Sequence, residues 1–156
     1  MHTLVRRYIK TAVFYLMVGL VIGGVMIVRR ELYGSFPHPY LVSAHTHAIL
    51  VGFVMMMILG VALWLFPRPD REDTRYSPRA AQGAYWTLTL ATAARVAGEV
   101  ARAIQNAPRT ERSWVQWVIV AAGLGQVAAI GLFFFTMWSR IRPVGSHVRE
   151  AKGERF

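Results

Sequence analysis

Two histidines separated by a single residue, His45 and His47, stand near the start of a long apolar stretch. Imidazole is costly in hydrocarbon unless it binds something, so histidines placed here indicate a functional site. On a regular helix, residues two apart point about 200° away from each other, so the pair is unsuited to gripping one metal ion. Opposed imidazoles suit heme, whose iron takes one axial ligand on each side. His45 and His47 are therefore the candidate metal ligands.

A second group that could do chemistry is a charged triad further along the chain. Arg95, Glu99 and Arg102 are spaced i, i+4 and i+7, which places them on one face of a helix. Charges inside a membrane pair with one another or with a ligand, and arginine is suited to carboxylates such as heme propionates. Two interpretations stay open: an ion triad that only orders the bundle, or a ligand site in which Glu99 also orients a ligating imidazole.

Four apolar stretches must position these residues. They span about residues 11–28, 41–66, 80–105 and 114–138, and each is close to the roughly 20 residues that a membrane helix requires. Hydrophobic residues make up 54% of the chain, which is too many for an ordinary soluble domain. We predict an all-α, integral membrane four-helix bundle that forms a single domain over residues 1–156.

The chain contains no cysteine, which excludes disulfides, thiolate metal sites and covalently attached heme. Any metal or cofactor must therefore be held by His, Met, carboxylate or Tyr side chains. The expected cofactor is heme b, bound without a covalent bond, with His45 or His47 as its axial ligand. The second apolar stretch also contains Gly52, Gly60 and methionines at 55–57. The glycines make the helix narrow and the methionine side chains adapt their shape, so this stretch could pack against a flat apolar cofactor.

The net charge of +10 is explained by membrane topology better than by nucleic-acid binding. If the N-terminus is cytoplasmic, the inner segments hold 12 basic residues and the outer loops hold four, which are Arg29, Arg30, Arg109 and Arg112. This asymmetry predicts cytoplasmic N- and C-termini in the cell inner (cytoplasmic) membrane, with a basic face against anionic lipid. Residues 140–156 are expected to form a solvated basic tail, and the basic N-terminal segment leads into a retained anchor helix rather than a cleaved signal.

The residues around the histidine pair resemble a known family. The segment Leu41–His47, its glycine-containing apolar continuation and the Trp64–Arg68 exit are similar to a helix of the catalytic subunit of heme-copper oxidases and nitric-oxide reductases. In that family such a pair binds a low-spin and a high-spin heme on opposite faces. The family subunit has twelve helices in three similar four-helix arcs, whereas this chain has four predicted helices.

The resemblance implies heme ligation by His45 or His47 and propionate binding by Arg102, Arg109 and Arg112. It also implies electron transfer, or the binding or reduction of O2 or NO, with a respiratory-chain electron donor as partner. The family's copper site is not matched, because the remaining histidines, His2, His38 and His147, lie outside the predicted spans. An intact copper centre within one chain is therefore not expected.

Four helices supply few ligands, so we expect a homo-oligomer, as a dimer or trimer, with heme near the subunit boundary and bis-histidine ligation drawn from two chains. Two alternatives stay open. The chain is an accessory or assembly subunit of a larger oxidase or reductase, or it is a copper- or zinc-binding membrane protein that uses His45, His47 and Glu99.

Overall fold

A computed structural model describes residues 3–66, 77–106, 108, 110, 112–141 and 153. These residues are all helical or connecting, with no strand among them, which confirms the predicted all-α four-helix architecture. The elements in order are α1 (Thr3–Tyr33), α2 (Pro39–Thr46), the π-helix η1 (His47–Met55), α3 (Met56–Leu65), α4 (Pro78–Ile104), α5 (Trp114–Met137) and the 3₁₀ turn η2 (Trp138–Arg140).

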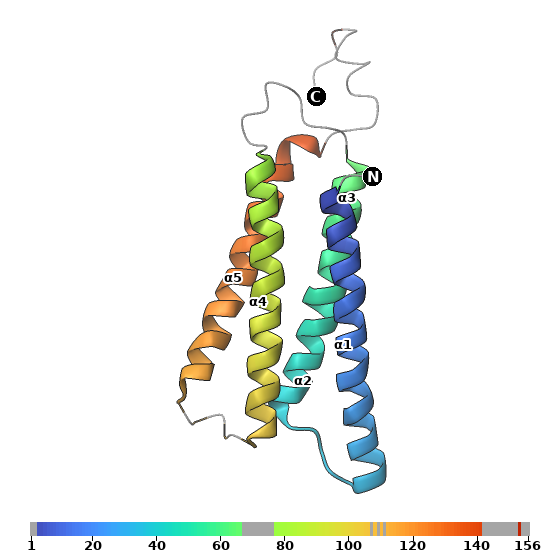
Figure 1. The fold of residues 1–156 in the computed structure, drawn as a ribbon, viewed down its shortest axis with the longest axis vertical. Coiled ribbons are helices and arrows are strands. Elements are labelled where there is room, and N and C mark those ends of the chain that lie inside the picture. Colours follow the sequence, from blue (N-terminus) through green and yellow to red (C-terminus); the bar gives the residue numbers. More distant parts are fainter. Residues whose placement is uncertain are drawn as a thin grey trace.

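Successive helices run in opposite directions, with α2, η1 and α3 forming one continuous rod (Figure 1). The connections after α1 and after α4 lie at one end of the bundle, here called the loop end. The start of α1, the end of α3 and the start of α4 lie at the opposite end, here called the terminal end. α1 packs along the α2–η1–α3 rod, α5 packs along α4, and the two pairs meet where α2 and η1 contact α4.

Local sequence signals set the helix ends. Pro39 stands in the first turn of α2, and His38 Nδ1 accepts the Tyr40 backbone N–H at 3.3 Å. Ser77 caps α4 in the same way and is followed by Pro78. Gly34 adopts a φ of 61° just beyond α1, a left-handed conformation that glycine takes at low cost and that ends the helix.

Three of the described helical segments are long and apolar enough to cross a membrane: Thr3–Tyr33, Pro39–Leu65 and Trp114–Arg140. α4 has 27 residues and a comparable length, but it carries charged side chains within its span and is correspondingly less apolar. It packs between α5 on one side and α2 with η1 on the other. Burial against these neighbours is what allows α4 to carry charge inside the bundle.

The second span is not the regular α-helix that its sequence predicts. Nine of its residues, His47–Met55, form a π-helix, an arrangement that is rare and that recurs at functional sites. Just before it, Thr46 Oγ1 donates to Val42 O at 3.0 Å and His47 Nδ1 donates to Ser43 O at 2.8 Å. These side chains compete for the carbonyls of the helix ladder at the point where the wider turns begin.

The glycines of this span pack against tyrosines of α1 rather than against a flat cofactor. A Cβ placed on Gly52 would lie 2.5 Å from Tyr15 Cγ, and one on Gly60 would lie 2.9 Å from Tyr8 Cβ. Met56 is fully buried in the same cluster. The expected cofactor space beside these glycines is therefore filled by α1, and the glycines allow the two helices to approach closely.

Four helices meet in one apolar core near the terminal end. Tyr8 is fully buried and makes edge-to-face contacts with Tyr85, at a centroid distance of 5.0 Å, and with Phe133, at 6.0 Å. A smaller cluster toward the loop end joins Ile22, Ala44, Ala48 and Val96.

Arg140 is not part of a solvated tail, contrary to expectation. It is buried, and its Nη2 donates to Phe66 O at 3.1 Å and to Leu63 O at 3.4 Å. These carbonyls belong to the last turn of α3, where helix C-termini leave acceptors unsatisfied and favour a cation. Residues 142–152 and 154–156 of the predicted tail lie outside the described part of the chain.

We expect Arg140→Ala to destabilise the protein by about 1–3 kcal/mol, because two partly buried carbonyls lose a charged donor. Thermal unfolding in detergent, followed by circular dichroism, measures this change. Arg79→Ala is the matched control, since Arg79 is exposed at the same end of the bundle. Equal destabilisation by both changes would contradict a capping role for Arg140.

Candidate heme site

His45 and His47 contact different helices, as their two-residue spacing predicts. His45 Nδ1 lies 2.9 Å from the carbonyl oxygen of Gly19 in α1. His47 Nδ1 lies 2.8 Å from Ser43 O and 3.6 Å from Glu99 Oε2 in α4. The α2–η1 rod therefore presents one imidazole to each of its two neighbours.

The bond to Gly19 determines which nitrogen of His45 can bind a metal. A carbonyl only accepts hydrogen bonds, so Nδ1 carries the hydrogen and the neutral ring has its lone pair on Nε2. Histidine ligands in metal sites almost always donate their second ring nitrogen in this way. The contact with the backbone of α1 thus leaves Nε2 as the nitrogen of His45 that carries the lone pair.

A glycine on α1 makes room for this ring. A Cβ placed on Gly23 would lie 2.9 Å from His45 Cε1 and 3.2 Å from its Nδ1, closer than real side chains approach. Gly23 is one turn beyond Gly19, so the same helix face supplies both the acceptor and the space. The backbone of α1 is in this way shaped to the His45 imidazole.

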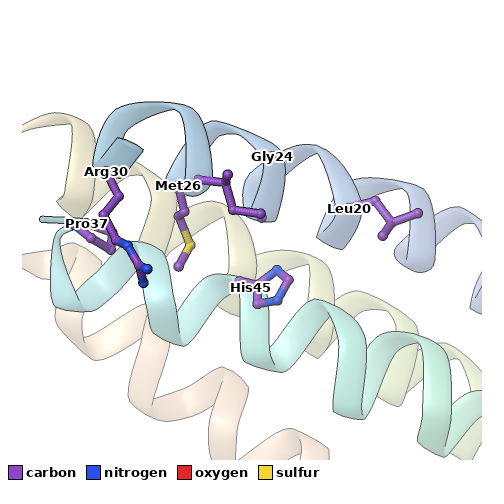
Figure 2. A pocket seen from close by; sticks show the side chains of 8 residues that line it. Leu20, Gly24, Met26, Arg30, Pro37 and His45 are labelled. Atoms are coloured by element: carbon purple, nitrogen blue, oxygen red, sulfur yellow. The ribbon is translucent and has the colours of Figure 1, made fainter. Parts of the chain in front are cut away.

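His45 lines a pocket of about 430 Å3 between α1 and α2 (Figure 2), within the size range of cofactor sites. The pocket is mainly apolar, with Arg30 as its single charged residue. Leu20 and Ile27 at its rim are exposed, so the pocket opens sideways from the bundle. The remaining lining residues are Gly23, Gly24, Met26 and Pro37.

His47 belongs instead to a polar cluster between the rod and α4. Ser43 Oγ donates to Glu99 Oε1 at 2.8 Å, and Arg95 Nε lies 3.3 Å from the same oxygen. The Glu99 side chain is only 3% exposed, and a carboxylate buried to this degree needs such partners to stay ionised. Ser43 and Glu99 together hold His47 from two helices.

The cluster continues into α5. Arg95 Nη1 donates to Gln126 Oε1 at 3.1 Å, and Gln126 Nε2 donates to Thr92 Oγ1 at 3.1 Å. Gly123 leaves the space for the guanidinium, since a Cβ there would lie 2.9 Å from Arg95 Nη1. A chain of polar contacts therefore links three helices through the interior.

Arg102 does not complete the expected ion triad. Its Nη1 donates to Ser113 Oγ at 3.1 Å, its Nη2 donates to Pro108 O at 2.8 Å, and the guanidinium lies 5.3 Å from the centre of the Tyr40 ring. These contacts secure the connection between α4 and α5, away from the pocket. Of the other two arginines expected to bind propionates, Arg112 is exposed at this end and Arg109 lies outside the described residues.

The pocket offers three features that a heme would use. An imidazole with Nε2 as its lone-pair nitrogen, a glycine-lined wall and apolar surroundings are what a porphyrin needs, and Arg30 offers a cation for a propionate. A copper or zinc site fits less well. No three His, Asp or Glu side chains gather at one point in the described ranges, and His45 faces away from His47 and Glu99.

Four functional residues were missed from the sequence: Gly23, Arg30, Ser43 and Gln126. Arg30 counted only toward membrane topology, although it lines the His45 pocket. For Ser43 a usable signal existed, because it precedes His47 by four residues and therefore shares its helix face. Gly23 and Gln126 depend on contacts between helices, which spacing along the chain does not reveal.

We expect Gly23→Ala to weaken heme binding by about ten- to a hundredfold. The added methyl group pushes against the His45 ring, and overpacking of this kind costs about 1–3 kcal/mol. Titration of the detergent-solubilised protein with hemin measures the affinity. Gly131→Ala is the control, because a Cβ on this α5 glycine meets nothing within 4 Å. Equal weakening by both changes would argue against a specific contact between Gly23 and the His45 ring.

Comparison with protein families places the chain in a known family. The model of cytochrome c and quinol oxidase polypeptide I matches residues 3–150 of the chain. Comparisons with curated proteins and with solved structures gave no match. The family match covers every residue of the pocket and of the polar cluster.

Proposed function

Because the chain belongs to the family of cytochrome c and quinol oxidase polypeptide I, we propose that it binds one heme b in the α1–α2 pocket, with His45 as an axial ligand. The protein is a membrane protein related to heme-copper oxidase subunit I. The proposal concerns which cofactor it carries and where.

The observation that carries the proposal is the state of the His45 ring. Its Nδ1 donates to Gly19 O, so Nε2 is the nitrogen available for coordination, and the ring stands in a wall of an apolar pocket. A histidine with a purely structural role would make the same kind of hydrogen bond to the neighbouring helix. It would not be expected to line a cavity as well, whereas His45 lines one of about 430 Å3. An imidazole with a fixed orientation and a cavity that could receive a cofactor therefore occur at the same place.

Arg30 is proposed as the partner of a heme propionate, in place of Arg102, Arg109 and Arg112. It lines the pocket near the loop end of α1, and its Nε now lies 2.8 Å from the exposed carboxylate of Glu31. Exchange of that solvated pair for a propionate costs little, since surface ion pairs contribute about 0–1 kcal/mol.

A heme held here by His45 would supply an iron that exchanges one electron, or that binds O2 or NO. The chain's own part is to orient His45 through Gly19 and to surround the iron with hydrocarbon. The polar cluster around Glu99 lies on the far side of the rod, where Ser43 and Glu99 hold His47 in place.

Reconstitution with heme tests the proposal. The protein, purified in detergent and supplied with hemin, should show a Soret band and one heme b per chain by pyridine hemochrome. Failure to take up stoichiometric heme under ample supply would overturn the proposal and favour the accessory-subunit alternative. Co-purification with a large oxidase or reductase in the absence of heme would support that alternative directly.

We also propose that both termini face the cytoplasm, in the cell inner membrane, with a respiratory-chain donor as electron source. The terminal end of the bundle carries Arg6, Arg7 and Lys10, while the loop end carries Arg29, Arg30 and Arg112. The full basic asymmetry along the chain supports this orientation through the positive-inside rule.

A homo-oligomer is the proposed assembly, because the pocket opens sideways past the exposed side chains of Leu20 and Ile27. A second copy against this face would cover the heme edge, as a dimer or as a trimer. Native mass spectrometry in detergent should therefore report more than one chain per particle in the heme-loaded protein. A heme-loaded monomer would contradict the assembly without affecting the heme proposal.

A further inference from the structure

The inward face of α4 carries a stripe of polar side chains through the interior of the bundle. Tyr85, Thr89, Thr92, Arg95 and Glu99 follow one another at spacings of three or four residues, which places them on one face of the helix. All five are buried or partly buried. At about 1.5 Å per residue the stripe is roughly 21 Å long, which is most of the roughly 30 Å hydrocarbon core of a membrane.

Three polar atoms along this stripe are buried without a hydrogen-bond partner among the residues that the structure describes. They are Glu99 Oε2 and Thr89 Oγ1 of α4, and Oη of Tyr8, whose ring packs on Tyr85 at a centroid distance of 5.0 Å. Buried polar groups of folded proteins are nearly always bonded, either to protein or to ordered water. We propose that an ordered water molecule binds at each of these three atoms.

The hydroxyl of Thr89 is directed away from its own helix. A threonine inside a helix usually bonds to a preceding carbonyl, as Thr136 Oγ1 does when it donates to Phe133 O at 2.8 Å. Thr89 Oγ1 makes no such bond, although Tyr15 Oη of α1 donates to the Thr89 carbonyl at 2.7 Å. The Tyr15 oxygen keeps its lone pairs, so the side of α4 that faces α1 offers acceptors to a water held by Thr89.

The carboxylate of Glu99 is satisfied on one oxygen only. Ser43 Oγ and Arg95 Nε both approach Oε1, at 2.8 and 3.3 Å. His47 Nδ1 lies 3.6 Å from Oε2 and is 2.8 Å from Ser43 O. A polar contact of this length is one that a water molecule commonly bridges. A water that donates to Oε2 would complete the shell of this buried carboxylate.

Tyr8 differs from the other two buried tyrosines. Tyr15 Oη donates to Thr89 O, and Tyr85 Oη pairs with Thr11 Oγ1 at 2.8 Å. Tyr8 is fully buried and its Oη has no protein partner in the described ranges. The Tyr85–Thr11 pair uses only one of its two hydroxyl hydrogens, so a donor remains beside the Tyr8 ring.

These waters would complete the polar contacts between α1 and α4. Helices in a membrane gain little from the hydrophobic effect on association, so interhelical hydrogen bonds contribute to holding them together. Folded proteins contain about one buried water for every 27 residues, so three sites in a chain of 156 residues are an ordinary number. None of the three atoms lines the α1–α2 pocket, and the proposal is therefore independent of heme binding.

The sign of a stability change tests the proposal. Removing a hydroxyl that binds water loses a hydrogen bond, whereas removing an unpaired buried hydroxyl relieves the cost of burying it. Tyr8→Phe and Thr89→Val should each lower the midpoint of thermal unfolding in detergent by about 2–4 °C, the shift that loss of one hydrogen bond gives in a chain of this size. An unchanged or raised midpoint in both variants would overturn the proposal.

Matched variants control for the substitutions themselves. Thr87→Val alters an exposed threonine of the same helix and Tyr33→Phe alters a tyrosine that is 76% exposed, so neither should lower the midpoint. Tyr85→Phe removes a hydroxyl with a protein partner and provides the reference loss.

A crystal structure of the full chain, at a resolution that shows ordered water, locates the molecules directly. Density for water is expected within about 2.5–3.2 Å of Tyr8 Oη, Thr89 Oγ1 and Glu99 Oε2. Lowered midpoints combined with protein partners, and no water, at these atoms would overturn the proposal as well.

Discussion

Replacing His45 with alanine should abolish stoichiometric heme binding. The His45 imidazole is the proposed iron ligand in the α1–α2 pocket, and its orientation is set by the 2.9 Å contact with Gly19 O. Without it, the described lining of the pocket offers no nitrogen ligand for the iron. Hemin titration, followed by the Soret band and pyridine hemochrome, measures the loss, with heme content expected to fall from one per chain to near zero.

His47→Ala provides the contrasting result. Since His47 faces α4, its removal should leave heme content at one per chain and lower the stability of the bundle instead. His38→Asn serves as the control, because asparagine can also cap α2. Equal partial loss of heme in His45→Ala and His47→Ala would contradict the assignment of the two imidazoles to different partners.

Removing the carboxylate of Glu99 should destabilise the protein by about 3 kcal/mol. Glu99→Met leaves Arg95 without its counter-ion and Ser43 without its acceptor, and breaking a buried ion pair on one side costs about 3–5 kcal/mol. The low end of that range applies, because the Arg95 side chain is 25% exposed. Unfolding in detergent, monitored by circular dichroism against temperature or added SDS, gives the change in free energy.

Two companion variants show whether charge is the cause. Glu99→Gln keeps an oxygen acceptor for Ser43 and should cost less than Glu99→Met. The double variant Arg95→Met/Glu99→Met removes both charges and should recover part of the loss, because a buried ion pair replaced by apolar residues is often neutral in stability. A double variant less stable than Glu99→Met would show that Arg95 contributes mainly through Gln126.

The helical architecture was predictable because three of the described helical segments are long and apolar enough to form helix in a membrane whatever their neighbours do, while α4 depends on burial against its neighbours. The interruption of the second span was not. Residues His47–Met55 have no feature along the chain that distinguishes a π-helix from an α-helix. The structure places this segment directly after the bonds of Thr46 and His47 to preceding carbonyls and packs Tyr15 beside its Gly52.

The candidate site was predictable in part. Intramembrane histidines and charges draw attention because each is costly in hydrocarbon, so His45, His47, Arg95 and Glu99 could be selected from the sequence. Their partners could not. Arg102 shares a helix face with Glu99, yet it bonds to Ser113 and Pro108, because the end of α4 meets the start of α5 at that level.

The sequence by itself determined that this chain is an all-helical membrane protein of the oxidase subunit I family and that His45 and His47 face opposite ways, since these depend on hydropathy, motif and helix periodicity. Only the tertiary structure decided what each imidazole faces. Gly19 and Gly23 of α1 orient His45 beside the α1–α2 pocket, whereas Ser43 and Glu99 hold His47. The physical reason is that periodicity fixes the direction of a side chain on its own helix, while the packing of helices distant in the sequence supplies its partner.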